Sequence, residues 1–136
     1  MNPSKELVCK ENGKIFRLYT NGIKFDKIKL DDGQNNECKK CDYLITKQTK
    51  DIQIFVELKG SDVMRAYEQI LASYENNKAA QCKCYAAIIT SKIPQMDSTV
   101  QRLKRKAHKI FKEVFIKNNK LETRYNLVKN EIEKSN

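Results

Sequence analysis

The order of apolar and polar residues along the chain predicts several β-strands in its first half. In residues 14–30, two runs of alternating apolar and polar residues are joined by Asn21-Gly22. Asn-Gly is typical of tight turns in which both central residues have positive φ, so we expect a β-hairpin here. A third and a fourth strand are expected over residues 41–47 and 52–59, separated by the polar turn 48–51. The alternation therefore predicts four strands before residue 60.

Helical spacing of apolar residues follows in two later segments. After Gly60, a helix capped by Ser61 or Asp62 is expected to run to about residue 76. A longer helix is expected over residues 97–116. Between the two helices, residues 84–90 form a continuous apolar run, which is typical of a buried strand. Strands and helices thus alternate in the second half of the chain.

The two ends of the chain complete the expected order of elements. Asn2 and Pro3 offer an N-cap and a first-turn proline, so we expect a short helix over residues 3–11. Residues 31–40 are polar and are expected to form a loop. From Leu121 onward the pattern fits both a helix and a strand, and we favour a short strand after the turn at residues 118–119. This order predicts a mixed α/β domain.

Length and composition limit the class of protein. The chain has 136 residues, of which 40% are hydrophobic, and this size suits one hydrophobic core. We therefore expect a single domain over residues 1–136. No run of about 18 apolar residues is present, and the first residues lack the apolar run of a signal peptide. We expect a cytosolic protein that does not span a membrane.

The charge of the chain points to an anionic partner. The formal net charge is +10, as in many proteins that bind nucleic acid. Basic residues are concentrated in the helix expected over residues 97–116, where the candidate contacts to a phosphate backbone are Arg102, Lys104, Arg105, Lys106 and Lys109. The alternative interpretation is a solvated outer helix face opposite the apolar stripe.

The most informative residues lie where one expected strand begins and the next one ends. Asp42 begins the third strand, and Glu57, Leu58 and Lys59 end the fourth. Because side chains alternate along a strand, Glu57 and Lys59 project from one face and Leu58 from the other. If the two strands pair as a hairpin, Asp42 lies near Glu57. The sequence therefore predicts two carboxylates beside a lysine.

Such a group of residues suits a divalent cation. The carboxylates of Asp42 and Glu57, together with the Leu58 carbonyl, offer the hard oxygen ligands that Mg²⁺ or Mn²⁺ prefers. The metal can activate water and neutralise charge on a phosphate, which Lys59 would also stabilise. A Glu-X-Lys triplet also occurs by chance at solvated strand edges. Here it follows the apolar residues 54–56, where a solvated charge pair is less expected.

This arrangement resembles the PD-(D/E)XK nuclease superfamily, which has the restriction endonuclease-like fold. The motif residues are Cys41-Asp42 and Glu57-Leu58-Lys59. The resemblance implies an αβββαβ core with a mixed central sheet flanked by helices, to which this chain adds an N-terminal hairpin strand and a C-terminal basic helix. It also implies a supporting role for Gln69 on the helix after the fourth strand.

The resemblance implies an Mg²⁺-dependent or Mn²⁺-dependent endonuclease that hydrolyses phosphodiester bonds in DNA, with RNA as the other candidate substrate. Cys41 replaces the proline of the motif, and the acidic residue that some branches take from the N-terminal region is Glu6, Glu11 or neither. A homodimer or a partner protein would supply specificity. The alternative is a non-catalytic module on the same fold that binds nucleic acid or protein and keeps a vestigial acidic site.

The five cysteines allow one further interpretation. A cytosolic location favours thiols or metal ligands over disulfides. Cys38, Cys41, Cys82 and Cys84 could supply the four thiolates of a structural zinc site. Cys-X-Cys spacing is uncommon in such sites, and Cys84 begins an apolar strand, where a buried thiol is ordinary. We expect no tightly bound zinc.

Overall fold

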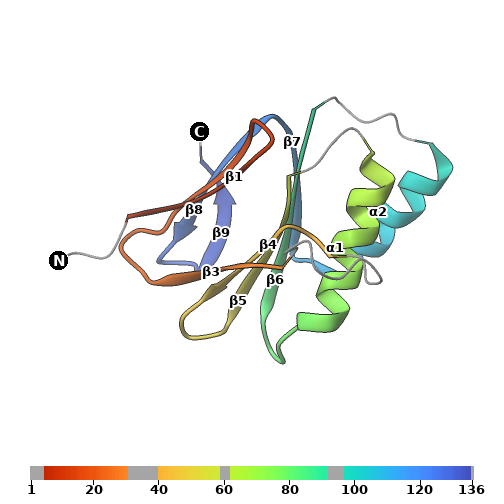
Figure 1. Ribbon diagram of the computed structural model, residues 1–136. Helices are drawn as coiled ribbons and strands as arrows, with labels where there is room; N and C mark the ends of the chain where they lie inside the picture. The colour runs from red at the N-terminus through yellow and green to blue at the C-terminus, as the bar shows by residue number, and fades with distance from the viewer. Residues whose placement is uncertain (1–4, 31–39, 59–61, 92–96, 136) are drawn as a thin grey trace.

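Two β-sheets pack face to face, and two helices cover the other face of the larger sheet (Figure 1). The structure is a computed structural model that describes residues 5–30, 40–58, 62–91 and 97–135. The three layers are therefore a small sheet, a large sheet and a pair of helices, with one hydrophobic core on each side of the large sheet.

The large sheet forms the middle layer and has five strands in the order β3-β4-β5-β6-β7. Their bounds are Phe25–Lys29, Tyr43–Lys47, Ile52–Glu57, Lys83–Thr90 and Glu113–Asn118. The first three strands are antiparallel neighbours, whereas β5, β6 and β7 run parallel. Parallel neighbours need a crossover connection. Helices α1 (Val63–Asn77) and α2 (Ser98–Ile110) supply the two crossovers.

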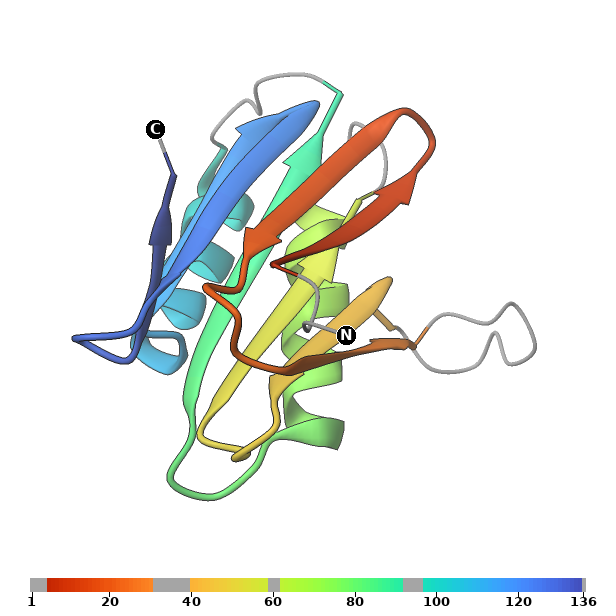
Figure 2. The same ribbon diagram turned by 90° about the vertical axis from the view of Figure 1, so that its left-hand side faces the viewer.

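The small sheet has four strands in the order β1-β2-β8-β9 (Figure 2). Their bounds are Glu6–Glu11, Lys14–Tyr19, Lys120–Asn126 and Glu131–Lys134. Strands β2 and β8 are parallel, and the outer pairs are antiparallel. The sheet thus joins the two ends of the chain, because β1 and β2 come from its beginning and β8 and β9 from its end.

The alternation of side chains along β5 explains why this sheet lies in the middle. Ile54 and Val56 belong to the core between the two sheets, and Phe55 between them belongs to the core under the helices. All three are fully buried. A strand with both faces covered has apolar residues at consecutive positions, and this is the pattern of residues 54–56.

Several sequence predictions are confirmed. The predicted third and fourth strands are β4 and β5, and they form an antiparallel hairpin. The helix after Gly60 is α1, with Asp62 as its N-cap. The apolar run 84–90 is part of β6, and the strand favoured after residues 118–119 is β8. The mixed α/β class is also confirmed.

The predictions for the N-terminal region are wrong in two respects. Residues 6–11 form strand β1 instead of a helix, because Asn12 and Gly13 adopt positive φ and turn the chain into the antiparallel partner β2. Residues 14–30 do not form a hairpin, although Asn21 and Gly22 both have positive φ as predicted. Strand β2 pairs with β1 and β8, and the chain then crosses to the large sheet.

The predicted second helix is too long. Helix α2 ends at Ile110, and residues 113–118 form strand β7, in which Phe115 packs into the core between the sheets. The basic helix is therefore not C-terminal, since three strands follow it. The predicted first helix of an αβββαβ core is absent from the described residues, and the helices cover only one face of the large sheet. In the described ranges no helix has the length and apolar character needed to cross a membrane. Residues 31–39 of the predicted loop 31–40 lie outside the described residues.

Candidate active site

The β4-β5 hairpin brings Asp42 and Glu57 together at one end of the strands of the large sheet. Tyr43, the first residue of β4, pairs with Val56, so Asp42 just before it lies beside the end of β5. The Asp42 backbone N–H donates a hydrogen bond to Glu57 Oε1 at 3.1 Å. The Leu58 backbone N–H donates to Asp42 Oδ2 at 2.7 Å. Each carboxylate is therefore held by the backbone of the other strand.

Both carboxylates are buried, with exposed fractions of 1% for Asp42 and 0% for Glu57. Removing a carboxylate from water is costly unless hydrogen bonds or opposite charge compensate. The two backbone N–H groups supply part of this compensation. A divalent cation would supply opposite charge, and carboxylate oxygens are the ligands that Mg²⁺ and Mn²⁺ prefer. The donor set therefore fits such a metal.

The remaining motif residues lie on either side of this pair. Leu58 is fully buried, and its side chain belongs to the core between the sheets. It thus faces away from Glu57, as the alternation along β5 predicts. Its carbonyl remains the third candidate ligand. Lys59, the predicted phosphate-stabilising residue, lies outside the described residues.

Gln69 acts on the segment that leads into Asp42. It is buried on α1, and its Nε2 donates a hydrogen bond to the Lys40 carbonyl at 3.1 Å. The helix is fixed at its beginning by Asp62, whose Oδ1 accepts from the Arg65 backbone N–H at 3.0 Å. Gln69 therefore positions the backbone two residues before Asp42.

Ser73 was missed by sequence reasoning and has a related role. It lies one turn after Gln69 on α1 and is buried. Its Oγ accepts a hydrogen bond from the Cys41 backbone N–H at 2.7 Å. The spacing of four residues, which places Gln69 and Ser73 on one helix face, was the available signal. Together they hold the backbone of residues 40 and 41 against α1.

Cys41 is an inert thiol in this environment. It is fully buried, and burial, together with smaller contributions from the nearby carboxylates of Glu57 and Asp42, raises the pKa of the thiol to about 12. The thiol is thus neutral near pH 7, and neutral thiols are poor nucleophiles and metal ligands. Cys41 therefore serves as a small, buried apolar side chain.

The cysteines proposed as zinc ligands do not converge in the described part of the chain. Cys41 precedes β4 near the end of β5, whereas Cys84 pairs with Gln53 near the beginning of β5. The Cys84 thiol contacts Gln53 Oε1 at 3.6 Å. Cys38 lies outside the described residues. Among those that are described, no group of three His, Cys, Asp or Glu side chains could hold a metal ion.

The same finding bears on the acidic residues of the N-terminal region. Glu6 forms an ion pair with Arg17 at 3.7 Å on the small sheet. Glu11 lies at the end of β1 and, within the described ranges, does not complete a group of three ligands with Asp42 and Glu57. The candidate site therefore has two described carboxylates.

The predicted basic residues form an exposed surface on α2. Arg102, Lys104, Arg105, Lys106 and Lys109 are all exposed, and the helix contains no acidic residue. Within the described residues none of the five forms an ion pair. Arg102, Arg105 and Lys109 lie at spacings of three and four, on the face opposite Val100 and Ala107, which are buried. We call these three residues the α2 stripe.

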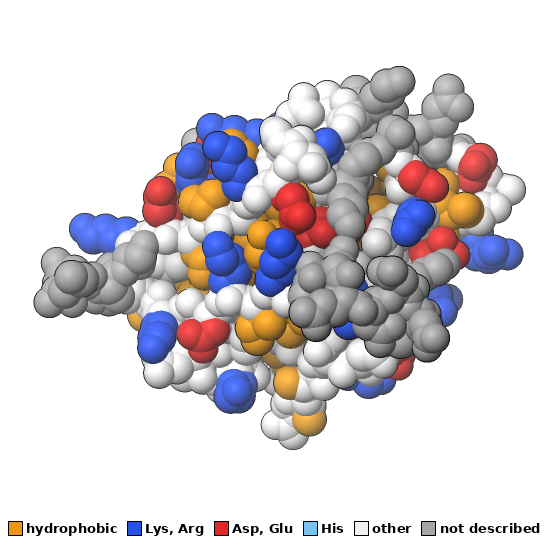
Figure 3. All heavy atoms as spheres, in the orientation of Figure 1, with side chains coloured by type: hydrophobic (Ala, Val, Ile, Leu, Met, Phe, Trp, Pro, Cys, Tyr) orange, Lys and Arg blue, Asp and Glu red, His pale blue; other side chains and the backbone are white. Residues whose placement is uncertain are grey.

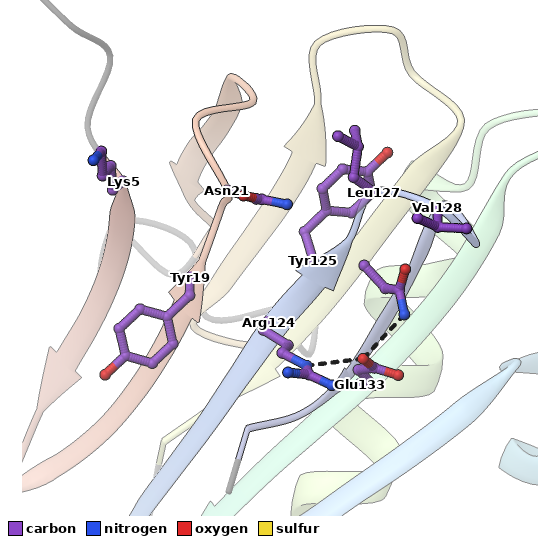
Figure 4. A pocket seen from close by; sticks show the side chains of 9 residues that line it. Lys5, Tyr19, Asn21, Arg124, Tyr125, Leu127, Val128 and Glu133 are labelled. Atoms are coloured by element: carbon purple, nitrogen blue, oxygen red, sulfur yellow. Dashed lines mark hydrogen bonds and ion pairs between the residues drawn. The ribbon is translucent and has the colours of Figure 1, made fainter.

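A separate groove lies at the other end of the small sheet (Figure 4). Two of its charged groups pair with each other, because Arg124 Nε donates to Glu133 Oε1 at 2.8 Å, and Asn126 Nδ2 donates to the same oxygen at 3.2 Å. Strand β8 begins after β7, at the same strand ends as Glu57, and runs away from Glu57. The groove is therefore remote from the two carboxylates.

No protein-family model, curated protein or solved structure matched the chain.

Proposed function

We propose that the protein is a divalent metal-dependent nuclease that hydrolyses phosphodiester bonds in DNA. The observation that carries this proposal is the buried pair of carboxylates, Asp42 and Glu57, held by reciprocal hydrogen bonds at the ends of adjacent strands. Buried acidic residues that converge in this way are unfavourable for folding alone and are typical of sites that hold a cation.

The residues around this carboxylate pair would have different roles in the reaction. Asp42, Glu57 and the Leu58 carbonyl would hold Mg²⁺ or Mn²⁺, which when bound activates water and neutralises charge on a phosphate. Lys59 would offset further negative charge as the phosphodiester bond breaks. Gln69 and Ser73 would keep the backbone before Asp42 in place through the contacts described above.

The order of elements in the large sheet supports the resemblance to PD-(D/E)XK nucleases. Strands β3, β4 and β5 are followed by α1 and then by β6, parallel to β5. This order is the one expected for the βββαβ part of that core, and Asp42 and Glu57 lie at the adjoining ends of its second and third strands. Strand β1 in place of the first helix is a departure from that core.

The α2 stripe supports a nucleic acid as substrate. Exposed cations on a helix that contains no acidic residue can bind a phosphate backbone and release its counterions, which favours polyanions of any sequence. So small a domain leaves little surface for reading bases, and we propose that a second copy or a partner protein supplies specificity.

The decisive experiment is incubation of the purified protein with plasmid, linear duplex and single-stranded DNA and with RNA, each with Mg²⁺ or Mn²⁺ and with chelator. We expect cleavage of DNA only when the metal is present. Binding that is independent of metal, without cleavage of any substrate, would contradict the nuclease and support the non-catalytic module.

A further inference from the structure

The small sheet has one face that no described part of the chain covers. Alternation along β1, β2 and β8 places Cys9, Phe16 and Leu121 in the core between the two sheets. The side chains of the intervening residues form the opposite face, which is turned toward the viewer in Figure 2. We call it the outer face of the small sheet. A sheet with one face uncovered is able to pack against a second sheet.

Exposed apolar side chains gather at one end of the outer face, in the groove described above. Within the described ranges five large hydrophobic side chains are exposed, and Tyr19, Leu127 and Val128 are three of them. All three line the groove. Val128 is 95% exposed, and Figure 4 shows it with Leu127 on one side of the groove and Tyr19 on the other. A partner that covers these side chains would remove apolar area from water, which is favourable.

This end of the small sheet is almost neutral, although the chain is strongly basic. The groove is lined by two basic residues, Lys5 and Arg124, and by one acidic residue, Glu133, which gives a net charge of +1. The whole chain has a net charge of +10, and Lys and Arg side chains are spread over the face shown in Figure 3. Two copies of the chain repel each other least where the local charge is smallest. The groove therefore favours the approach of a second copy.

The strand registers make the outer face complementary to itself. A two-fold axis parallel to the strands, between β2 and β8, would place β2 of one copy over β8 of the other. Tyr19 pairs with Arg124 across these strands, and Arg17 pairs with Glu122. Between two copies, Tyr19 would therefore face an arginine and Arg17 a glutamate, which gives a cation–π pair and an ion pair. A two-fold interface requires this kind of self-complementarity.

The same rotation fits the shape of the groove. The turn after β8 carries Leu127 and Val128, and it would lie over the β1 and β2 side of the groove in the second copy. Lys5 and Tyr19 are on that side (Figure 4). The exposed turn of each copy would thus enter the hollow of the other.

The like charges that this rotation brings together are already paired. Glu6, Tyr19, Arg124 and Glu133 lie in one row across the small sheet, so Glu6 of one copy would face Glu133 of the other. Within its own copy Glu6 forms an ion pair with Arg17 at 3.7 Å, and Glu133 forms one with Arg124 at 2.8 Å. The two carboxylates therefore meet at the rim with their charges compensated.

We infer that the outer face of the small sheet is the interface of a two-fold symmetric homodimer, with the groove as its apolar part. A stable interface covers about 800 Å² on each partner, about a tenth of the 8102 Å² of accessible surface, so the outer face must contribute together with the groove. The dimer is independent of the proposed nuclease activity. By alternation with Phe55, Glu57 projects from the helix-covered face of the large sheet. The two candidate sites would therefore lie on opposite sides of the dimer, and, if the proposed function holds, each copy would act on a separate segment of nucleic acid.

The test measures the molar mass of the full chain by sedimentation equilibrium, in chelator and without nucleic acid. We expect a mass that rises from one copy toward two as the concentration increases from about 1 to 100 µM. Val128→Asp would place an unpaired charge in the interface and should raise the dissociation constant of the dimer at least about tenfold. Leu127→Asp, in the same turn, should have the same effect. Both residues are exposed, so circular dichroism should show an unchanged fold.

The matched control is Met64→Asp, which changes an exposed hydrophobic residue on α1 and should leave the dissociation constant unchanged. A monomer at every concentration would overturn the inference and would leave the outer face to a different protein partner. A dimer that survives both Val128→Asp and Leu127→Asp, or one that Met64→Asp weakens equally, would overturn it as well. A dimer weakened only by the two groove variants would support the inference whether or not the protein cleaves DNA, so failure of the nuclease proposal would be seen separately.

Discussion

Asp42 and Glu57 each combine a structural contact with the proposed contact to metal. Glu57 accepts from the backbone of Asp42, and Asp42 accepts from the backbone of Leu58. Removal of either side chain would leave a buried N–H group without its acceptor, which costs about 1–3 kcal/mol. A test of catalysis at these positions must therefore retain the hydrogen bond and remove only the charge.

Glu57→Gln meets this requirement, because an amide oxygen can still accept from the Asp42 N–H. We expect the rate of metal-dependent cleavage to fall by at least about 100-fold, since a metal ligand is lost. The melting temperature should change little. Glu57→Ala should lose both activity and stability, and Lys59→Ala should lose activity alone. Full activity of Glu57→Gln at unchanged stability would contradict the site.

Asn130, outside the candidate site, forms three hydrogen bonds with its side chain. It has a positive φ of 54°. Its Oδ1 accepts from Lys47 Nζ at 2.9 Å and from the Tyr125 hydroxyl at 2.6 Å, and its Nδ2 donates to Asp51 Oδ2 at 2.8 Å. One side chain thus links the turn after β8 to the hairpin of β4 and β5.

We expect Asn130→Ala to destabilise the protein by about 2–3 kcal/mol, because it loses these hydrogen bonds and alanine is strained at positive φ. Asn130→Gly loses the bonds but adopts positive φ freely, so it should be less destabilised by about 1 kcal/mol. Denaturant unfolding of both variants separates the two effects. Equal stability of the alanine and glycine variants would show that backbone strain contributes nothing.

At the scale of elements, the sequence was informative wherever local pattern and long-range pairing agree. Strands β4 and β5 are joined by a short turn, and the buried run in β6 excludes a surface element. The candidate site depends on this hairpin, so Asp42 and Glu57 could be placed together from the sequence alone. Gln69 could be placed because α1 begins at a recognisable cap.

The wrong predictions arise where distant pairing decides the outcome. Residues 6–11 have a weak local pattern and become β1 because β2 pairs with them. Residues 113–116 continue the helical pattern of α2, yet they form β7 because β6 offers a parallel partner. In both cases the local sequence shows the spacing of apolar residues, but it does not show which distant strand will pair with the segment.

The α2 stripe gives a prediction at this scale. A triple substitution to Gln at Arg102, Arg105 and Lys109 should weaken binding of DNA. It should also reduce the slope of log affinity against log salt by about one per lost contact. The salt dependence of binding, measured in chelator, tests it. The matched control replaces Lys50, Lys129 and Lys134, which are also exposed and carry the same total charge. If both triple variants lose the same slope, only net charge matters and α2 has no special role.

At the scale of the whole molecule, hydrogen bonds join the small sheet to the large sheet at both ends of the strands. At the strand ends near Glu57, the Ile15 N–H of β2 donates to the Asn119 carbonyl, and the Asn119 N–H donates to the Thr90 carbonyl, both at 2.9 Å. At the opposite ends of the strands, Asn130 and Asp51 connect the small sheet to the large one. The two sheets are therefore fixed to each other both at the strand ends near Glu57 and at the opposite ends.

The hydrogen bonds of Asp51, at the strand ends opposite Glu57, should make the free energy of unfolding depend on pH. Hydrogen bonds from Thr49 and then Asn130 lower the pKa of Asp51 to about 2, against an ordinary value of 3.8. Because the folded pKa is below the unfolded value, the contribution is complete above about pH 4 and is lost as the pH falls toward 2. Asp51 is 38% exposed, so solvent screening limits it to about 1 kcal/mol. Asp51→Asn should lack this part of the acid destabilisation in unfolding measured from pH 5 to pH 2, and an identical pH profile would contradict the assignment.

Binding of a divalent cation at Asp42 and Glu57 should stabilise the whole molecule. A ligand that binds only the folded state contributes about 1.4 kcal/mol at ten times its dissociation constant, which raises the melting temperature of a domain of this size by about 3–6 °C. The measurement compares MgCl₂ or MnCl₂ with NaCl of equal ionic strength, each against chelator. Glu57→Gln and Asp42→Asn should abolish the shift, because each removes a ligand charge from a buried pair that has only two described carboxylates. Asp51→Asn, which removes a carboxylate at the strand ends opposite Glu57, should retain the shift in melting temperature. A shift that survives both Asp42→Asn and Glu57→Gln would place the cation elsewhere and would remove the main support for the proposed nuclease.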